Sequence, residues 1–499
     1  MPEADLPSEP HPPSEDVGYA SLSTTADRLA GGDWTSRRVV DTLLERIAAV
    51  DDGGPELRSV LAINPDARAI ADERDRERSS GQLRGPLHGI PVLIKDNIEA
   101  TELPGTAGSL ALAGRPVRAD APLVSRLRDA GAVVLGATNL SEWANFRSPE
   151  STSGWSAVGG LTGNPWALDR SAGGSSSGSG AAVAAGLAPL AIGTETNGSI
   201  TCPAALNGVV GLKPTVGSVS AQQVVPISGS QDVPGPMARS VRDVALAYSV
   251  LSGRHECADP DPGAASTLRI GVAEAWLSRH AATDARFEEV VGIIASLVSD
   301  VQRVPVPPND GSVHSDQLTV LVSEMRSDLD AYLAGRGGSG PSSVSDVVAF
   351  NREHARAELA YFGQEFMEQA AASEGRSSDE YLQARERNVA FARDRCLGPA
   401  YDSVDLLVAP AYQPSWKSDL IHGDQLSGGG DVCTPPAILG WPILTIPMGL
   451  VDDLPVGLSI TGPAGAEDRL LALGMAVERV LAWSGSAASR PTWRAPQRG

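Results

Sequence analysis

In its first half the chain reads Asp169-Arg-Ser-Ala-Gly-Gly-Ser-Ser-Ser-Gly-Ser-Gly-Ala181, a loop of glycine and serine that runs into a segment of small residues. The small residues from about 178 to 187 predict a helix, and the apolar residues from 188 to 193 predict a strand directly after it. A loop-rich stretch inside a large domain usually carries function. On its own, this loop also fits a flexible linker or a phosphate-binding turn, although it lacks the glycine and lysine motif of nucleotide-binding loops.

Helices and strands alternate along the sequence that flanks this loop. Residues 36–50 have the apolar spacing of an amphipathic helix, and 89–94 form a short apolar run typical of a buried strand. A helix at 123–130 is followed by a strand at 132–136, so the alternation predicts an α/β fold. Further helices are expected at 65–78, 346–396 and 467–483, further strands at 406–409, 443–446 and 456–460, and surface excursions at 253–267 and 305–345.

The charge of the chain excludes two classes of partner. Its 40 Lys and Arg residues stand against 61 Asp and Glu, and the net charge of −21 repels phosphate backbones and anionic lipid surfaces. We therefore expect no nucleic acid and no membrane as partners. There is no apolar run of the roughly 20 residues that a membrane span needs, and the N-terminus is acidic and proline-rich, which predicts a cytoplasmic protein. The four cysteines and seven histidines show no ligand spacing, so we expect no metal and no cofactor.

Lys95 directly follows the strand predicted at 89–94. Burial penalises a charged ammonium group and lowers its pKa, so a lysine at the end of a buried strand can act as a general base. Lysine is rare in this chain, which contains only Lys95, Lys213 and Lys417. Taken alone, Lys95 also fits the commoner structural role of an ion pair with Asp96 or another acid.

A second turn combines glycine with small polar residues and reads Gly193-Thr-Glu-Thr-Asn-Gly-Ser-Ile-Thr-Cys-Pro-Ala204. Backbone amides around such a turn can converge on one point, as an oxyanion hole requires.

Together, the segment around Lys95 and the stretches 169–181 and 193–204 resemble the amidase signature family. The resemblance continues through 207–215, 232–239, 440–448 and 454–458, and so covers most of about 20–250 and 400–483. It implies a single large domain with a central mixed β-sheet covered on both faces by helices. On this basis we expect a disordered leader at 1–17, the amidase signature domain at 18–484 with variable inserts at about 253–345, and a polar tail at 485–499.

By motif position, the resemblance implies a catalytic triad of Lys95, Ser175 and Ser199. Neutral Lys95 would take a proton from Ser175, which would take one from the nucleophile Ser199, and an acyl-enzyme would form. The resemblance also implies a cis peptide bond between Gly174 and Ser175, and an oxyanion hole made by the backbone amides of Thr196, Asn197, Gly198 and Ser199.

Three segments resemble the peptide amidase branch of the family, namely 139–148, 193–196 and 419–424. Members of that branch remove ammonia from the C-terminal amides of peptides. We therefore expect a peptide amide or a small-molecule amide, such as an N-acyl amino acid amide, as the substrate of a monomer or homodimer. Two residues depart from the pattern, since Asn197 stands where Asp or Gly is expected and Ala172 replaces another small residue.

Three alternatives remain open. Residues 174–178 fit G-x-S-x-G, the nucleophile elbow of α/β-hydrolases, centred on Ser176. That interpretation needs a histidine further along the chain, and it leaves Lys95 and Ser199 unexplained. Within the family, the chain could instead be an amidase of other small, aryl or fatty amides, or a non-hydrolytic amidotransferase-type subunit.

Overall fold

The computed structural model describes residues 17–426, 428–483 and 489–494. The leader expected at 1–17 and the tail expected at 485–499 therefore lie largely outside the described residues. In the described ranges, no helix is long and apolar enough to cross a membrane.

Strands from the whole length of the chain join one central sheet. Within the described residues it has eleven strands, in the order β1 (Val60–Ile63), β3 (Val133–Thr138), β2 (Pro91–Lys95), β8 (Leu190–Glu195), β10 (Val233–Ala238), β9 (Val210–Lys213), β14 (Ile443–Val451), β15 (Leu454–Thr461), β13 (Leu406–Pro410), β11 (Arg269–Ala273) and β12 (Asp300–Val304). β2 pairs in parallel with β3 and β8, whereas β10 pairs antiparallel with β8 and β9. The mixed sheet expected for this α/β domain is confirmed.

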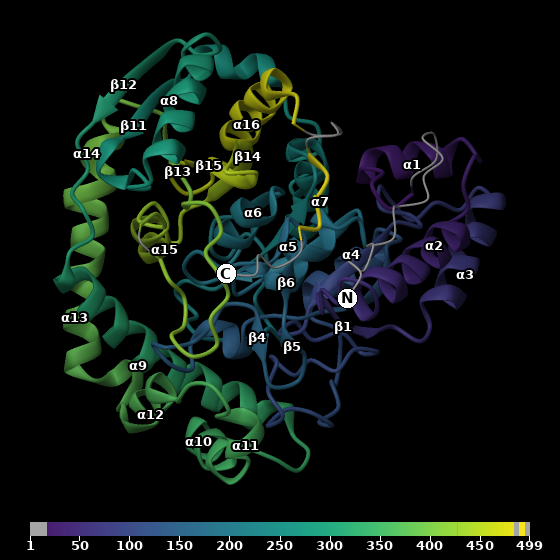
Figure 1. Cartoon of the computed structure of the whole chain (residues 1–499), viewed down its shortest axis with the longest axis horizontal. Helices are drawn as coiled ribbons and strands as arrows, with labels where there is room; N and C mark the ends of the chain where they lie inside the picture. Colours follow the sequence, from purple (N-terminus) through teal and green to yellow (C-terminus); the bar gives the residue numbers. More distant parts are fainter. Residues whose placement is uncertain (1–16, 427, 484–488, 495–499) are drawn as a thin grey trace, which may run out of the picture.

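Helices cover both faces of the sheet (Figure 1). They are α1 (Leu22–Ala30), α2 (Ser36–Ile47), α3 (Ala67–Ser79), α4 (Pro122–Asp129), α5 (Ser177–Ala184), α6 (Thr201–Asn207), α7 (Val241–Ser252), α8 (Ala281–Ala295), α9 (Gly311–Arg336), α10 (Val344–Glu353), α11 (Ala355–Glu358), α12 (Glu365–Ala372), α13 (Asp379–Ala390), α14 (Gly398–Tyr401), α15 (Thr434–Leu439) and α16 (Glu467–Leu481). Two short hairpins lie between β3 and α5 in the sequence, one of β4 (Trp155–Ser156) with β5 (Gly160–Leu161) and one of β6 (Gly163–Asn164) with β7 (Ala167–Ser171). The helices and strands predicted from the sequence pattern are found with ends shifted by a few residues, except that the helical range expected at 346–396 is divided into α10, α11, α12 and α13.

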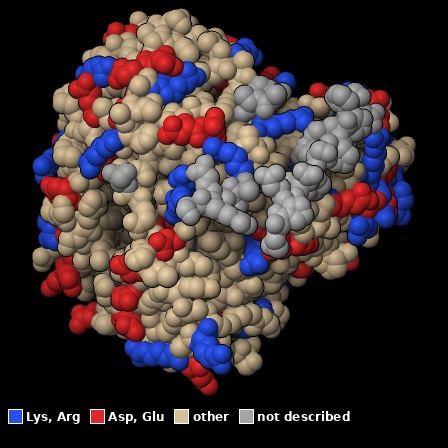
Figure 2. All heavy atoms as spheres, in the orientation of Figure 1, with Lys and Arg blue, Asp and Glu red and all other residues tan. Residues whose placement is uncertain are grey.

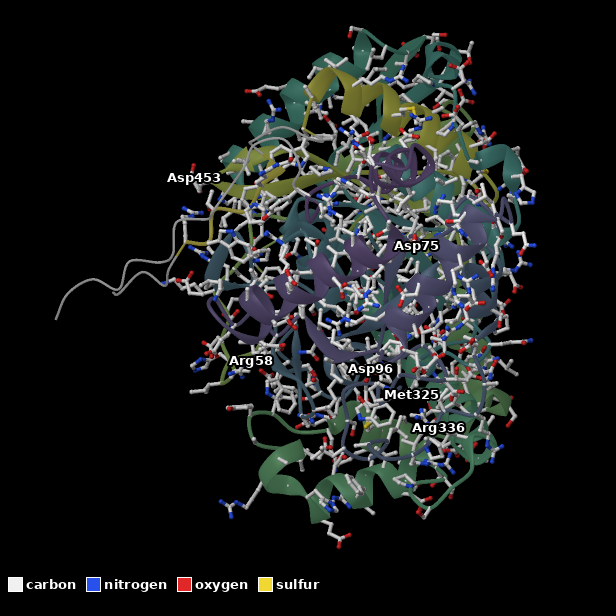
Figure 3. All side chains as sticks on the ribbon, turned by 90° about the vertical axis from the view of Figure 1, so that its right-hand side faces the viewer. Arg58, Asp75, Asp96, Met325, Arg336 and Asp453 are labelled. Carbon is white, nitrogen blue, oxygen red and sulfur yellow. The ribbon has the colours of Figure 1, made fainter. Side chains whose placement is uncertain are left out.

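The prediction of a surface excursion at 305–345 was wrong. This range forms α9, a helix of 26 residues, which packs against α10, α12 and α13 and buries Val320, Met325 and Leu329. These apolar side chains are covered by helices that come later in the chain, so the local sequence does not reveal their burial. Figure 3 labels Met325 and Arg336 of this unit, and Arg336 donates to the carbonyl oxygen of Gly105, whose amide donates to Asp96.

Helix α5 shows why the central stretch is rich in glycine and serine. All eight of its residues are buried between the sheet and α6. A Cβ atom on Gly178 would lie 2.2 Å from the Ser59 carbonyl oxygen and 2.5 Å from the Asn139 carbonyl oxygen. Only a residue without a side chain permits this approach, and the approach fixes the helix directly after Ser175 and Ser176.

The surface charge is dispersed on the face drawn in Figure 2, where acidic and basic side chains are interspersed. Exposed pairs such as Arg303 and Glu274, whose N and O atoms are 2.9 Å apart, each stabilise the fold by only about 0–1 kcal/mol. The fold therefore depends on burial around the sheet, and not on its surface ion pairs.

Two glycine substitutions test this packing. Gly178→Ala should lower the free energy of unfolding by about 1–3 kcal/mol, because its Cβ would overlap two carbonyl oxygens. Gly292→Ala, in α8 with open space around it, should raise it by up to about 1 kcal/mol through helix propensity. Thermal denaturation of both variants measures the difference, and equal melting temperatures would contradict the packing of α5.

Candidate active site

Two parallel strands and one loop bring the candidate site together. Lys95 is the last residue of β2, and Thr194 lies one residue before the end of the neighbouring strand β8. The loop that carries Ser175 and Ser176 ends at the start of α5. Because parallel strands end at the same edge of a sheet, the polar side chains of all three segments meet there.

Lys95 is fully buried among hydroxyl and carbonyl oxygens. Its Nζ lies 2.8 Å from Ser175 Oγ, 3.0 Å from Ser176 Oγ and 2.9 Å from Thr194 Oγ1. Loss of hydration lowers the pKa of Lys95 to about 7, although the negative charges of Asp232 and Glu195 oppose this change. An amine with this pKa can be uncharged near neutral pH and can accept a proton.

The structure thus places Lys95 and Ser175 together, as the sequence predicted. The peptide bond between Gly174 and Ser175 is cis, also as predicted. The Ser175 carbonyl oxygen accepts a hydrogen bond from the Ser141 amide at 3.1 Å, which fixes the backbone at this point.

Ser176 has no room to act as an exposed nucleophile. It is fully buried, and its hydroxyl donates to the Thr194 carbonyl oxygen at 3.1 Å while it accepts from Lys95. These contacts occupy the hydroxyl within the protein. They favour the interpretation in which Lys95 is a general base over the one in which Ser176 is the nucleophile of an elbow.

Ser199 lies beside this group and is 8% exposed, the most accessible of the three predicted triad residues. Its carbonyl oxygen accepts a hydrogen bond from the Ser176 amide at 3.1 Å, so the two loops are joined through their backbones. Among the described residues, no hydrogen bond joins the hydroxyls of Ser175 and Ser199. The transfer between these two hydroxyls therefore stays a prediction.

Glu195 shapes the turn that contains Ser199, a role that the sequence did not predict. Its carboxylate accepts hydrogen bonds from the amides of Gly198, Ile200 and Thr201 at 2.9, 2.7 and 2.8 Å. Gly198 has φ +85°, and a Cβ there would lie 2.6 Å from Tyr412 Oη, so glycine is required. The Gly198 amide, expected in the oxyanion hole, is thus bonded to Glu195.

Asp232 and Asn97 complete the polar surroundings, and neither was predicted as a site residue. Asp232 Oδ1 accepts from Thr196 Oγ1 at 2.6 Å, which holds the first residue of the turn at 196–199 that is expected to form the oxyanion hole, here called the oxyanion turn. Burial raises the pKa of Asp232 to about 6. Asn97 Nδ2 donates to Thr194 Oγ1 at 3.0 Å. The only sequence signal for Asp232 was its place in the Asp-Val-Pro-Gly-Pro motif at 232–236.

One segment that resembles the peptide amidase branch, 419–424, is tied to the surroundings of the site through Asp424. Asp424 accepts hydrogen bonds from the Ser153 amide at 3.0 Å and from Trp416 Nε1 at 3.1 Å, and Ser153 lies against Gly174. Asn197, which differs from the residue expected in the family pattern, donates from Nδ2 to Thr434 Oγ1 at 3.2 Å. Its side chain therefore connects the turn that contains Ser199 to the start of α15.

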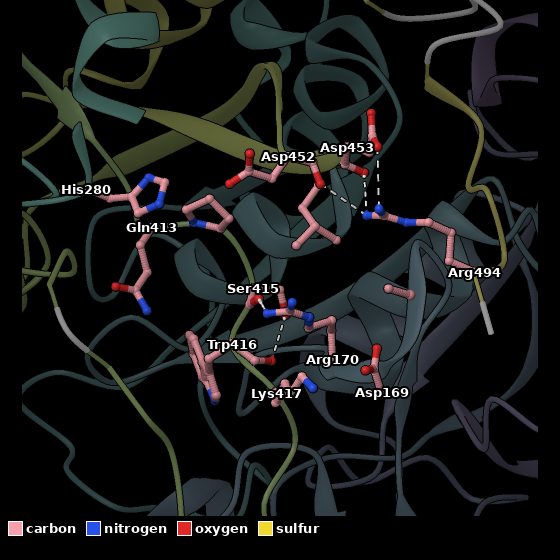
Figure 4. Close-up of a pocket in the computed structure, with 13 residues that line it drawn as sticks. Asp169, Arg170, His280, Gln413, Ser415, Trp416, Lys417, Asp452, Asp453 and Arg494 are labelled. Carbon is pink, nitrogen blue, oxygen red and sulfur yellow. Dashed lines mark hydrogen bonds and ion pairs between the residues drawn. The ribbon is translucent and has the colours of Figure 1, made fainter. Parts of the chain in front are cut away.

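Within the described residues there is no cluster of three or more His, Cys, Asp or Glu side chains that could hold a metal ion. A surface groove of about 950 Å³ lies between the β14–β15 turn and the loop at 413–417, and none of the triad residues lines it (Figure 4). Arg170, Lys417 and Arg494 face Asp169, Asp452 and Asp453 around it, so opposite charges largely balance there.

Known proteins share both the sequence and the fold. A model of the amidase family matches residues 38–471. One subunit of the glutamyl-tRNA(Gln) amidotransferase of Mycolicibacterium gilvum is 36% identical over 91% of this chain and 96% of its own length. The structure of native peptide amidase from Stenotrophomonas maltophilia is 43% identical with a TM-score of 0.86, and the match covers 94% of this chain and 98% of that one. A peptide amidase in complex with the competitive inhibitor chymostatin is 44% identical with a TM-score of 0.87, covering 92% of this chain and 97% of that one.

The resemblance to the amidase signature family, and within it to peptide amidases, is thereby confirmed. Since the family model spans most of the chain and the solved structures share its whole fold, the chain belongs to the amidase family and is an amide-hydrolysing enzyme.

Proposed function

We propose that this amidase hydrolyses the C-terminal carboxamide of peptides or of N-acyl amino acid amides and releases ammonia. The observation that carries the chemistry is the contact of 2.8 Å between the buried Lys95 amine and the Ser175 hydroxyl. The match to peptide amidases over nearly the whole chain supports the substrate class.

The reaction begins with two coupled proton transfers among Lys95, Ser175 and Ser199. Neutral Lys95 accepts the proton of Ser175 while Ser175 accepts that of Ser199, and Ser199 Oγ attacks the amide carbon. Without such a base a hydroxyl is too weakly acidic to attack an amide. The negative charge that develops on the carbonyl oxygen is stabilised by the amides of Thr196, Asn197 and Ser199, since the Gly198 amide is bonded to Glu195.

The tetrahedral intermediate then collapses. The proton on Lys95 returns through Ser175 to the leaving nitrogen, the C–N bond breaks, and ammonia departs from an acyl-enzyme on Ser199. Water then attacks this ester while its proton passes through Ser175 to neutral Lys95. The proton returns through Ser175 to Ser199 Oγ as the C–O bond breaks, which releases the carboxylic acid and restores Ser199.

Burial of the catalytic groups supports a small leaving group. Lys95 and Ser175 are fully buried, and Ser199 is 8% exposed. An internal peptide bond needs room for chain on both sides of the scissile bond, whereas a terminal carboxamide leaves only ammonia. A second candidate, the non-hydrolytic amidotransferase-type subunit, is favoured by the 36% identity to a component of a glutamyl-tRNA(Gln) amidotransferase.

The lysine base predicts a defined pH dependence. Its pKa of about 7 means that Lys95 is protonated and inactive below that value and neutral above it. The value of kcat/KM should therefore rise through about pH 7 and reach a plateau on the alkaline side. Lys95→Arg should lose as much activity as Lys95→Ala, because arginine cannot become neutral. A flat profile down to pH 5, or an active Lys95→Arg enzyme, would show that Lys95 is not the base.

Glu195→Gln tests the turn that presents Ser199. The amide side chain keeps one acceptor oxygen where the carboxylate serves three backbone amides, so the turn should shift and kcat should fall about 10–100-fold. Glu467→Gln is the matched control, because Glu467 is also buried and accepts from a backbone amide, that of Thr215, away from the serines. Equal kcat values for the two variants, each measured per folded enzyme, would show that the turn held by Glu195 has no catalytic role.

A substrate panel tests the amide class. We expect the isolated chain to release ammonia from peptide amides and N-acyl amino acid amides. Mass spectrometry should then show a gain of about one mass unit with the peptide backbone intact. Efficient cleavage of fatty or aryl amides with peptide amides untouched would refute the substrate class and leave the family unchanged. An isolated chain that releases no ammonia from any amide would favour the amidotransferase-type subunit.

A further inference from the structure

A small cavity adjoins the polar neighbours of Lys95. Its volume is about 10 Å³, close to what one water molecule requires. Its polar lining consists of Asn97, Thr194, Thr196 and Asp232, and the remaining walls are apolar. A cavity of this size holds a water only where two to four polar groups surround it, and this lining meets that condition.

Asn97, which lines this cavity, has a side-chain acceptor that no described residue satisfies. The side chain is 2% exposed, and its Nδ2 donates to Thr194 Oγ1. Among the described residues, Asn97 Oδ1 has no hydrogen-bond partner. A buried carbonyl oxygen without a partner costs about 1–3 kcal/mol, so a donor at this position would be strongly favoured.

Asp232 offers a second acceptor on the same cavity. Its Oδ2 accepts from the amides of Ile227 and Ser228 at 2.8 and 2.9 Å, while Oδ1 accepts only from Thr196 Oγ1. Since each carboxylate oxygen can accept two hydrogen bonds, Oδ1 has capacity for one more.

We propose that this cavity binds one water molecule, which donates hydrogen bonds to Asn97 Oδ1 and to the Asp232 carboxylate. The water closes a network that runs from Lys95 through Thr194 and Asn97 to Asp232, and from there to Thr196 in the oxyanion turn. The base and the turn at 196–199 are then linked through groups other than Ser175. Asn97 acts as a positioning residue in this network.

The cavity also has a neighbour that reaches the surface. A groove of about 540 Å³ is lined by residues of 216–221 and by Asp232, and it shares Ala221 and Asp232 with the cavity. Ala221 and Asp232 thus separate the two spaces, and Ser199 does not line either of them.

The network has a consequence for the titration of Lys95. The charged groups that act on Lys95 are Asp232 and Glu195, and Asp232 in turn is affected by Asp328 of α9. Replacing Asn97 by leucine removes the side-chain donor to Thr194 and the acceptor for the water, and makes the environment of Lys95 less polar. A less polar environment disfavours the charged ammonium and lowers the pKa of Lys95, so the acidic limb of the pH profile of kcat/KM should move to lower pH.

A crystal structure of the unmodified enzyme at high resolution tests the water directly. We expect a density peak within about 3 Å of both Asn97 Oδ1 and an Asp232 oxygen, and no such peak in Asn97→Leu. This measurement does not depend on which amide is cleaved. A cavity without density, in a map that shows other buried waters, would overturn the proposal, as would an Asn97 side chain turned to donate to Asp232 itself.

The pH profile of kcat/KM tests the network, and this arm alone rests on the proposed function. Asn97→Leu should move the acidic limb down by about half a pH unit. The matched control is Asn351→Leu in α10, a buried asparagine that also has a donating amide and an Oδ1 without a partner among the described residues. We expect its profile to stay unchanged. An unshifted profile in Asn97→Leu, or an equal shift in both variants, would refute the positioning role.

Discussion

The burial of one amine decides how the rest of this active site is built. A charged ammonium without water is expensive, and Lys95 is surrounded by oxygen atoms that it can reach without carrying a charge. Ser175, Ser176 and Thr194 provide these atoms from two segments, so the loop before α5 and the end of β8 must both be held in place. The parallel pairing of β2 with β8 and the close approach of α5 to the sheet provide that support.

Buried and half-buried carboxylates shape the backbone of the site. Each accepts hydrogen bonds from one or more backbone amides and from a hydroxyl nearby, and the set consists of the buried Asp96 and Glu195 and the half-buried Asp232 and Asp424. Their arrangement lets glycine-rich loops hold fixed positions without a helix or strand of their own. Arg336 of α9 donates to the Gly105 carbonyl in the turn that Asp96 holds, so the helical unit also supports this edge.

Much of the fold could be predicted because its core strands are short apolar runs. The strands that contain Leu93, Val134 and Leu407 read as buried from their own residues, and the structure buries all three. Helix α9 could not be predicted, because its apolar residues become buried only against later helices. The strands β11 and β12 were missed for a related reason, since they lie in a range that read as a variable insert and join the edge of the sheet through β13.

The candidate site was predictable to the extent that its motifs resemble a known family, and this resemblance predicted that Lys95 and Ser175 act together. Glu195, Asp232 and Asn97 were missed because acids and amides in loops usually face solvent. Only the folded chain shows that Glu195 and Asn97 are buried and that Asp232 is half-buried and bonded to Thr196.

The central claim is that Ser199 is a nucleophile activated by a neutral lysine. Labelling with a fluorophosphonate, followed by peptide mapping, tests it most directly, because such a reagent reacts with an activated serine in place of the substrate. We expect one label on Ser199, a labelling rate that rises with pH through about 7, and no label in Ser199→Ala. A label on Ser176, or labelling of Ser199→Ala at the rate of the unmodified enzyme, would contradict it.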